Sequence, residues 1–374
     1  MVSTKRTVFL GILTIVLIPT LVHAGGVKFS SGNPLDMDGN RINNLGLPVV
    51  RYDAASKEYV DLEIAAATDE VRTPISALPY TILVSGSYYV TRNLNGAGGG
   101  IEILASDVTV NLMGFTLDGG GVAEGPGIIY QYLENVTIIN GSIRGFGSAG
   151  IFGWNSEHVR VIDVQVLENG WSATFPGIYL NSNNALVVRC SVGDGSGGGI
   201  HVGHASRVLD SIAFNNDGYG ILAKNGSVLT NNIAYGSGED GIQSGYGSTL
   251  TNNTANENEW FGFQTGDSCI LRGNVARSNN QARSANYAGF YISRDSLVVN
   301  NAADDNYRAG FIVGGADNVL RNNHATESVA VGGVSDCFYF YSADNAAIRN
   351  TATGCTTEFA GSFPTTINRE NDAW

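Results

Sequence analysis

The chain has 374 residues, 49 glycines, 15% charged residues and a formal net charge of −13. This negative charge disfavours binding to nucleic acid or to anionic membranes, and an acidic sugar polymer would need bridging calcium or a local basic patch. The glycine content and sparse charge fit a tightly wound β structure, long enough for one elongated domain with a small extension.

Residues 1–24 have the pattern of a secretory signal peptide. Lys5 and Arg6 precede an apolar run over residues 8–22, and Ala24 offers a small residue at the expected cleavage position. The run is short for a membrane span, and no later stretch approaches the roughly 18 apolar residues that a membrane helix needs. We therefore expect a soluble, exported chain that is secreted or extracellular, with the cell surface or the periplasm as possible destinations.

Residues 25–79 form a separate segment before the repeats. Residues 35–45 read L-x-M-x-G-x-x-I-x-x-L, and residues 53–61 read D-A-A-x-K-x-Y-V-D. This pattern resembles a short module of phage tail fibres, a resemblance that implies homotrimerisation and an adhesive or receptor-binding setting. The apolar residues at helical spacing over residues 53–71 are equally compatible with an amphipathic helix that caps the open end of a solenoid.

Residues 80–356 repeat with a period of about 21 residues, which predicts one coil of a solenoid per repeat. A glycine followed by an aliphatic or aromatic residue recurs at Gly199, Gly220, Gly241, Gly262, Gly289 and Gly310. The segments between the glycines are short, rich in Val, Ile, Thr, Tyr and Asn, and alternate with period two, so helical repeats are excluded. Each coil has room for three short strands and three bends, and the fold class is all-β, a parallel β-solenoid with coils about 4.8 Å apart.

The repeated columns resemble the right-handed parallel β-helix repeats of the pectate-lyase-like superfamily. The resemblance covers roughly residues 84–356 and is specific for fold rather than activity. These repeats are shared by carbohydrate-active enzymes and by periplasmic copper-insertion accessory proteins. The chain has five histidines and three methionines, too few soft ligands for the copper role. Residues 357–374 leave the pattern and form a tail or a cap.

A small and mostly polar column supports the register of the repeat. Its members are Cys190, Ser211, Asn232, Asn253, Asn274, Asn301, Asn323 and Asn350. Asparagine in such a column can hydrogen-bond its copy on the next coil and tolerate a left-handed backbone, so we expect a structural role for it.

The four cysteines do not form the pattern of a disulfide scaffold. Cys190 and Cys269 lie almost four coils apart and should not pair. Cys337 and Cys355 lie within one coil of each other and could close the last turns.

The position after each glycine-aliphatic pair should face outward and stack into a row along the solenoid. The row comprises Ile129, Phe152, Tyr179, His201, Leu222, Gln243, Gln264, Tyr291, Ile312 and Tyr339. Aromatic rings and amides along one strip suit a sugar chain, and six of these residues are candidate substrate-binding residues: Phe152, Tyr179, Gln243, Gln264, Tyr291 and Tyr339. An ordinary mixed surface strip is the alternative.

Five residues from three consecutive coils form the best candidate catalytic cluster: Tyr179, His201, His204, Asp194 and Asp217. A tyrosine or histidine base beside carboxylates could abstract the proton next to a uronate carboxyl, or two carboxylates could hydrolyse a glycoside. Two histidines three residues apart on a strand and its bend rarely share a metal, so no metal site is assigned. Calcium remains possible at the acidic turns around Asp217 and Asp240, although solvated turns are the simpler expectation.

The sequence lacks the motifs that would carry a known activity over to this chain. The polygalacturonase set, the pectate-lyase R-x-P-x-x-R element and the mannuronan-epimerase D-P-H element are all absent. We therefore expect an exported β-helix protein that binds a polysaccharide or other glycan. The alternatives are a polysaccharide lyase, epimerase or glycoside hydrolase, and a structural surface fibre or adhesin.

Overall fold

The computed structural model describes residues 71–171, 175–362, 366–367 and 372–373. The predicted signal peptide and the segment with the fibre-like motif lie outside these residues, apart from residues 71–79. The chain divides into two units, Met1–Val71 and Arg72–Trp374, and the second contains the repeats. Among the described residues, no helix has the length and apolar character needed to cross a membrane.

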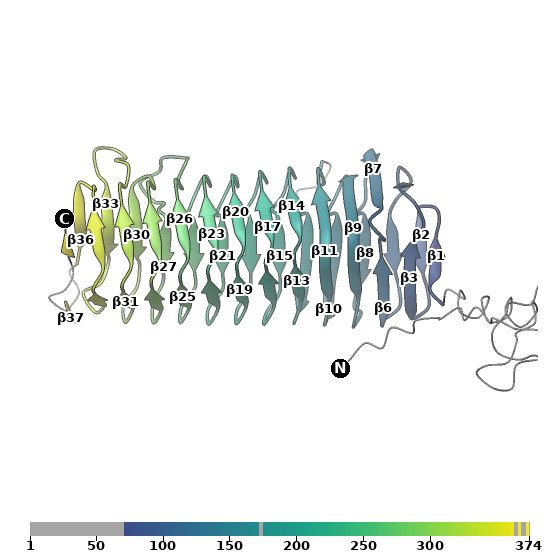
Figure 1. Cartoon of the computed structure of the whole chain (residues 1–374), viewed down its shortest axis with the longest axis horizontal. Helices are drawn as coiled ribbons and strands as arrows, with labels where there is room; N and C mark the ends of the chain where they lie inside the picture. Colours follow the sequence, from purple (N-terminus) through teal and green to yellow (C-terminus); the bar gives the residue numbers. More distant parts are fainter. Residues whose placement is uncertain (1–70, 172–174, 363–365, 368–371, 374) are drawn as a thin grey trace, which may run out of the picture. The chain divides into compact units, whose positions relative to one another are not determined.

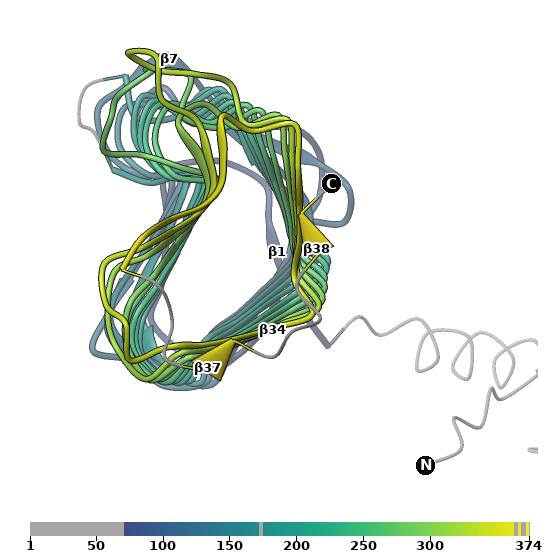
Figure 2. The ribbon, with the colours of Figure 1, turned by 90° about the vertical axis from the view of Figure 1, so that its left-hand side faces the viewer.

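The second unit is a parallel β-solenoid in which every full coil contributes to three strand ladders (Figures 1 and 2). One ladder is a separate sheet of 13 strands: β2 (Tyr80–Ile82), β5 (Ile101–Ile103), β8 (Ile128–Gln131), β10 (Ile151–Glu157), β12 (Ile178–Asn183), β15 (Ile200–Val202), β18 (Ile221–Ala223), β21 (Ile242–Ser244), β24 (Phe263–Thr265), β27 (Phe290–Ile292), β30 (Ala309–Val313), β33 (Asp336–Phe340) and β36 (Thr357–Gly361).

The other two ladders make up a single sheet of 25 strands, because the long strands β9 and β11 belong to both. The first ladder contains β1 (Thr73–Ile75), β3 (Gly86–Val90), β6 (Val108–Asn111), β9 (Thr137–Phe146), β11 (Arg160–Leu167), β13 (Leu186–Val188), β16 (Arg207–Leu209), β19 (Val228–Thr230), β22 (Thr249–Thr251), β25 (Ile270–Arg272), β28 (Leu297–Val299), β31 (Val319–Arg321), β34 (Ala346–Ile348) and β37 (Thr366–Ile367). The second adds β4 (Leu94–Asn95), β7 (Thr116–Ala123), β14 (Ser191–Gly193), β17 (Ile212–Phe214), β20 (Ile233–Tyr235), β23 (Thr254–Asn256), β26 (Val275–Arg277), β29 (Ala302–Asp304), β32 (His324–Thr326), β35 (Thr351–Thr353) and β38 (Asp372–Ala373).

These strands confirm the predicted fold class and extend beyond the predicted range of residues 80–356. At one end β1 pairs in parallel with β3, and at the other β36 pairs in parallel with β33. The repeat pattern misses these coils because β1 has no glycine-aliphatic pair before it and the end of the chain lacks the asparagine column.

The glycine that opens each repeat is required by the close stacking of coils. A Cβ atom on Gly199 would lie 2.4 Å from the carbonyl oxygen of Gly220, and one on Gly220 would lie 2.5 Å from the carbonyl oxygen of Gly241. Real Cβ atoms do not approach so closely, so only glycine fits this bend, which directs the chain into the 13-stranded sheet.

Identical positions stack along the core because the strands are parallel and in register. The inward residue after the glycine is isoleucine in β12, β15, β18 and β21 and phenylalanine in β24, β27 and β30. The rings of Phe263, Phe290 and Phe311 stack with centroids 4.7 and 4.6 Å apart, and Phe338 and Phe359 continue the column. Burial of these apolar columns is the main stabilising contribution to the fold.

The predicted asparagine column forms a buried hydrogen-bond ladder. The Asn253 amide donates to Asn274 Oδ1 at 3.0 Å and to the carbonyl oxygen of Leu229 at 2.9 Å, and Asn253 Oδ1 accepts from Asn232 Nδ2 at 2.9 Å. The left-handed backbone falls one residue earlier than predicted, at residues such as Asn231 and Asn252 with φ of 56° and 54°. The column itself keeps its amides buried, because the preceding residue makes the bend.

The cysteines behave as the spacing suggested. Cys337 and Cys355 form a disulfide with a Cα–Cα separation of 5.6 Å. Cys190 and Cys269 are buried free thiols. Burial raises the pKa of the Cys190 thiol to about 11, so this cysteine is inert at neutral pH.

Candidate functional site

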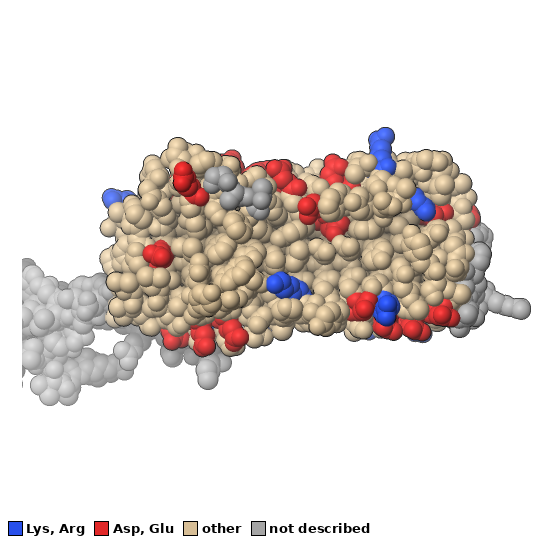
Figure 3. All heavy atoms as spheres, turned by 180° about the vertical axis from the view of Figure 1, so that it is seen from behind, with Lys and Arg blue, Asp and Glu red and all other residues tan. Residues whose placement is uncertain are grey.

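The predicted outward row is present in register along the 13-stranded sheet. Each residue lies opposite the next: Ile129, Phe152, Tyr179, His201, Leu222, Gln243, Gln264, Tyr291, Ile312 and Tyr339. Figure 3 shows this side of the solenoid, where charged side chains are sparse over the middle and gather toward the long edges. In the end-on view of Figure 2, the loops before this sheet project outward at its upper edge.

An aromatic cluster occupies the row at β10 and β12. The ring of Tyr179 stacks on Phe152 with centroids 5.2 Å apart and on Trp154 with centroids 6.0 Å apart. Phe175, in the loop before β12, packs edge-on against Phe152 at 5.3 Å. All four rings remain partly exposed, so the cluster presents apolar ring surface to solvent.

His201 continues the cluster on the next coil and is the most perturbed polar residue of the row. Its ring contacts Tyr179 edge-on at 4.9 Å, and its Nδ1 shares a hydrogen bond of 3.0 Å with the hydroxyl of Tyr219. The Nε2 atom is buried and has no hydrogen-bond partner among the described residues. Burial, and secondarily the charge of Lys224, lowers the pKa of His201 to about 4, so the imidazole is neutral at physiological pH.

Lys224 is the only lysine after residue 57, and it lies beside His201. Its Nζ donates to Asn181 Oδ1 at 2.6 Å, two coils away. The corresponding residue of the intervening coil is Gly203, which has no side chain to block the reach. The ammonium group has no carboxylate within ion-pair distance in the described part of the chain.

The loops before the sheet supply a second row of residues, of which sequence reasoning missed Tyr219 and the burial of Asp240. Tyr219 and Asp240 hold equivalent places, one residue before the glycines that open β18 and β21. Asp240 was expected in a solvated turn, but it is only 4% exposed. Its Oδ1 accepts the backbone N–H of Phe261 at 3.1 Å, and burial raises its pKa to about 7 despite that hydrogen bond.

The second half of the outward row contains amides and tyrosines in different roles. Gln243 Nε2 donates to Gln264 Oε1 at 3.0 Å, so the two amides form a continuous polar step. Tyr291 and Tyr339 pack against Ile312, which is only 4% exposed. Part of the surface of these two tyrosines is therefore buried against a local apolar cluster and is not exposed to solvent.

Within the described residues, three members of the predicted catalytic cluster make no hydrogen bond or ion pair with His201 or Tyr179. His204 is exposed in the turn after β15, where its backbone N–H donates to Asn183 Oδ1 at 3.3 Å. Asp194 follows β14, in the 25-stranded sheet, and its Oδ1 accepts from Asn215 Nδ2 at 3.2 Å. Asp217 is exposed in the loop that carries Tyr219. The coil brings Tyr179 and His201 together, and Tyr219 takes the place expected for a carboxylate.

The described residues contain no group of three or more histidine, cysteine, aspartate or glutamate side chains that could hold a metal ion.

A family model described as "Right handed beta helix region" matches residues 82–232. The match over these residues agrees with the right-handed parallel β-helix fold that the repeat columns implied. A search of curated protein sequences finds no match.

Several solved structures share the fold at low identity. The catalytic unit of a thermostable GH87 alpha-1,3-glucanase from Streptomyces thermodiastaticus matches with 13% identity and a TM-score of 0.56, covering 72% of this chain and 64% of the glucanase unit. This chain thus spans less than two thirds of that structure. A DFA-IIIase from Arthrobacter chlorophenolicus A6 in complex with DFA-III has 12% identity, a TM-score of 0.49 and coverage of 78% and 89%. The A-module of a mannuronan C-5 epimerase from Azotobacter vinelandii has 12% identity, a TM-score of 0.48 and coverage of 78% and 91%.

Proposed function

We propose that this protein binds carbohydrate on the outer face of its 13-stranded sheet. The observation that carries the proposal is the partly exposed aromatic cluster of Phe152, Trp154 and Tyr179, which continues in register into His201. Exposed apolar ring surface next to buried polar groups is what a sugar chain requires, because its C–H patches pack on rings while its hydroxyls need hydrogen bonds.

His201 gives this face a specific demand for a ligand hydroxyl. Whichever tautomer it adopts, the hydrogen bond with Tyr219 uses Nδ1 and leaves Nε2 buried without a partner. An orphaned buried polar atom costs about 1–3 kcal/mol. A sugar hydroxyl recovers this free energy if the side chains that cover Nε2 move aside on binding.

The rest of the row extends the binding strip along the solenoid. Stacked coils lie about 4.8 Å apart, close to the length of one residue in an extended glycan chain. The amide step of Gln243 and Gln264 would meet hydroxyls, and Tyr291 and Tyr339 would provide a further aromatic contact. Lys224 and Arg308 place cations on this face, Arg308 over the ring of Tyr339 and paired with Asp336, so both neutral and acidic glycans are tested.

A retention screen tests the proposal. The purified protein is incubated with insoluble or immobilised alpha-1,3-glucan, alginate, pectate and neutral plant polysaccharides, with and without calcium, and bound protein is measured after washing. We expect retention on at least one polysaccharide and reduced retention of a Tyr179→Ala variant. Retention on none of these polysaccharides would contradict the proposal.

Catalysis on the bound glycan is the second candidate, favoured by the protonation states of two residues. His201 is a neutral imidazole, and Asp240 has a pKa of about 7, close to that of an effective acid or base. A lyase or epimerase would use His201 or Tyr179 at a uronate, and a glycoside hydrolase would use Asp240 as its acid. Structural neighbours include carbohydrate-active enzymes, although their similarity bears on the fold alone.

Product analysis in the same screen separates binding from catalysis. Unsaturated products, reducing ends and altered uronate composition are followed over time. Products that disappear in a His201→Ala variant with an unchanged fold would establish an enzyme. Retention without any product would establish a binding module.

Export and assembly complete the proposal. The disulfide between Cys337 and Cys355 is typical of proteins outside the reducing cytoplasm and supports the signal peptide predicted for residues 1–24. Homotrimerisation through residues 25–79, and the fibre or adhesin role that it would imply, is tested by light scattering on the full chain and on a chain lacking residues 25–70. A monomeric full-length protein would contradict the trimer.

A further inference from the structure

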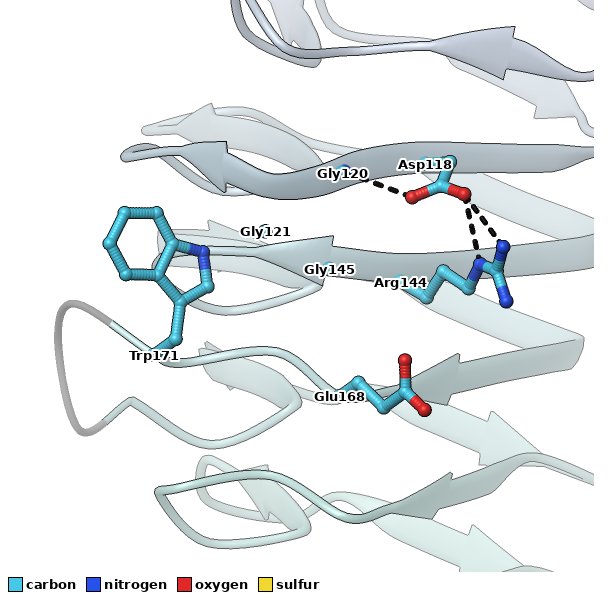
Figure 4. Close-up of a pocket in the computed structure, with 7 residues that line it drawn as sticks. All are labelled: Asp118, Gly120, Gly121, Arg144, Gly145, Glu168 and Trp171. Atoms are coloured by element: carbon cyan, nitrogen blue, oxygen red, sulfur yellow. Dashed lines mark hydrogen bonds and ion pairs between the residues drawn. The ribbon is translucent and has the colours of Figure 1, made fainter.

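A hollow lies on the 25-stranded sheet, apart from the 13-stranded sheet that carries the outward row. It has a volume of about 590 Å³. The hollow is lined by Asp118, Gly120, Gly121, Arg144, Gly145, Glu168 and Trp171 (Figure 4). These residues come from β7, from β9 and from the loop that follows β11.

A local irregularity of β7 creates the hollow. Asp118 lies opposite Arg144, but Ala123 lies opposite Phe146. Between these two pairs the chain advances five residues in β7 and two in β9, so β7 carries three extra residues. Gly120 and Gly121 adopt φ of 66° and 69°, and Gly145 adopts 69°. A Cβ atom on Gly145 would lie 3.2 Å from the backbone nitrogen of Gly120. The glycines thus open space that side chains would fill, and such bulges recur beside functional sites.

The polar floor of the hollow is pinned in place. Arg144 donates from Nε and Nη2 to Asp118 Oδ2 at 3.0 and 2.8 Å, while the N–H of Gly120 donates to Asp118 Oδ1 at 2.9 Å. Partial burial alone would raise the pKa of Asp118, but the hydrogen bonds and charge of Arg144 and the Gly120 N–H together lower it. Asp118 is therefore ionised, and both of its carboxylate oxygens already accept hydrogen bonds. Nη1 of Arg144 makes no hydrogen bond within the described residues.

Two more groups complete the lining. The carboxylate of Glu168 lies on the side of Arg144 away from Asp118, and its oxygens have no hydrogen-bond donor among the described residues (Figure 4). Trp171 is 48% exposed and stands at the other side of the hollow. The hollow thus combines the Arg144 guanidinium as a donor, the Glu168 carboxylate as an acceptor without a hydrogen-bond donor, and the ring of Trp171.

We propose that this hollow binds a single neutral sugar unit, independently of the proposal for the 13-stranded face. The Trp171 ring packs against the C–H face of the pyranose, Arg144 Nη1 donates to a ring or hydroxyl oxygen, and Glu168 accepts from a hydroxyl. One arginine and two carboxylates leave a formal charge of −1, and the whole chain carries −13, so an anionic sugar would be repelled. A neutral hexose fits the donor and acceptor pattern best.

Calorimetric titration of the purified protein with neutral trisaccharides tests this proposal. The probes are nigerotriose, laminaritriose and isomaltotriose, with trigalacturonate as an acidic probe and spermidine as a cationic one. We expect at least one neutral trisaccharide to bind, Trp171→Ala to abolish the binding that remains in a Tyr179→Ala protein, and Glu168→Gln to weaken that binding about tenfold, because a hydrogen bond to a charged group is stronger than one to a neutral amide. Tyr132→Ala and Glu134→Gln are matched controls at exposed positions of the neighbouring coil and should bind as the wild type does.

The outcomes separate the two proposals. Binding that persists in a Tyr179→Ala protein belongs to the hollow, and binding lost there but kept in Trp171→Ala belongs to the 13-stranded face. Three results would each overturn the proposal for the hollow. The protein could prefer trigalacturonate or spermidine, the Trp171→Ala variant could bind as the wild type does, or none of the neutral trisaccharides could bind.

Discussion

At the scale of single residues, burial sets the charge of two side chains on or beside the 13-stranded face. His201 is held neutral and Asp240 is held partly protonated near pH 7. Both deviations cost folding free energy in opposite pH ranges, because the unfolded chain titrates at ordinary values. Residues that keep unfavourable protonation states in a fold often serve a ligand or a reaction.

His201 should make the protein less stable in mild acid. Its folded pKa of about 4 lies below the unfolded value of 6.5, so the unfolded chain takes up a proton first as the pH falls. The stabilising contribution is complete above pH 6.5 and is lost as the pH falls to 4, a difference of about 3 kcal/mol. Denaturant unfolding between pH 7 and pH 4 should therefore show a steeper loss for the wild type than for His201→Leu. The exposed His158→Leu control should follow the wild type.

Asp240 should make the protein less stable as the pH rises. Its folded pKa of about 7 lies above the ordinary aspartate value of 3.8, so its contribution is present below pH 3.8 and is lost as the pH rises through 7. Asp240→Asn keeps an acceptor for the Phe261 N–H and removes the charge, so it should gain up to about 4 kcal/mol over the wild type between pH 4 and pH 8. Asp217→Asn, in the exposed loop of the preceding coil, is the control. An identical pH profile for wild type and Asp240→Asn would contradict the burial argument.

At the scale of elements, repeated residue types explain what could be predicted from the sequence. The columns of glycine, isoleucine and asparagine fixed the coil, the register and the outward row, because parallel stacking repeats one environment in every coil. Tyr219 was missed and Asp240 was wrongly expected in a solvated turn, because the loop before each glycine has no recurring residue type along the repeat. The hollow was missed because the three extra residues of β7 depart from the register that the columns define.

The asparagine ladder should contribute strongly to stability at each step. Asn253→Ala removes four hydrogen bonds and leaves the backbone N–H of Asn232 without its buried acceptor. Asn274 Oδ1 keeps the backbone N–H of residue 253, and Asn232 Nδ2 keeps the carbonyl oxygen of Val208. We expect a loss of about 3 kcal/mol in the free energy of unfolding. Thr251→Ala, on the partly exposed side of the neighbouring strand, should cost much less. Equal midpoints in urea for the two variants would show that the ladder is not stabilising.

At the scale of the whole solenoid, each coil depends mainly on its neighbours, so damage at an end should stay local. The disulfide between Cys337 and Cys355 joins β33 to the loop before β36 and closes a loop with a sequence separation of 18 residues. Loss of the bond should destabilise the terminal coils by about 3 kcal/mol.

Hydrogen exchange on a Cys337→Ser/Cys355→Ser double variant measures this local effect. Faster exchange is expected in β33 and β36, with β15, β18 and β21 unchanged. Faster exchange along the full length of the solenoid would instead indicate a single cooperative unit.

The 13-stranded face runs along the length of the solenoid, and the proposal that it binds carbohydrate depends most on the ring of Tyr179. The most direct test compares the affinities of wild type, Tyr179→Ala and Tyr235→Ala for the polysaccharide that retains the wild type. Tyr235 is a 37% exposed tyrosine on β20, in the other sheet, and serves as the matched control. The account predicts a loss of at least about tenfold for Tyr179→Ala, since a ring contact in a binding site is worth more than about 1.4 kcal/mol, and no change for Tyr235→Ala. Equal affinity of all three proteins would contradict binding on the 13-stranded face.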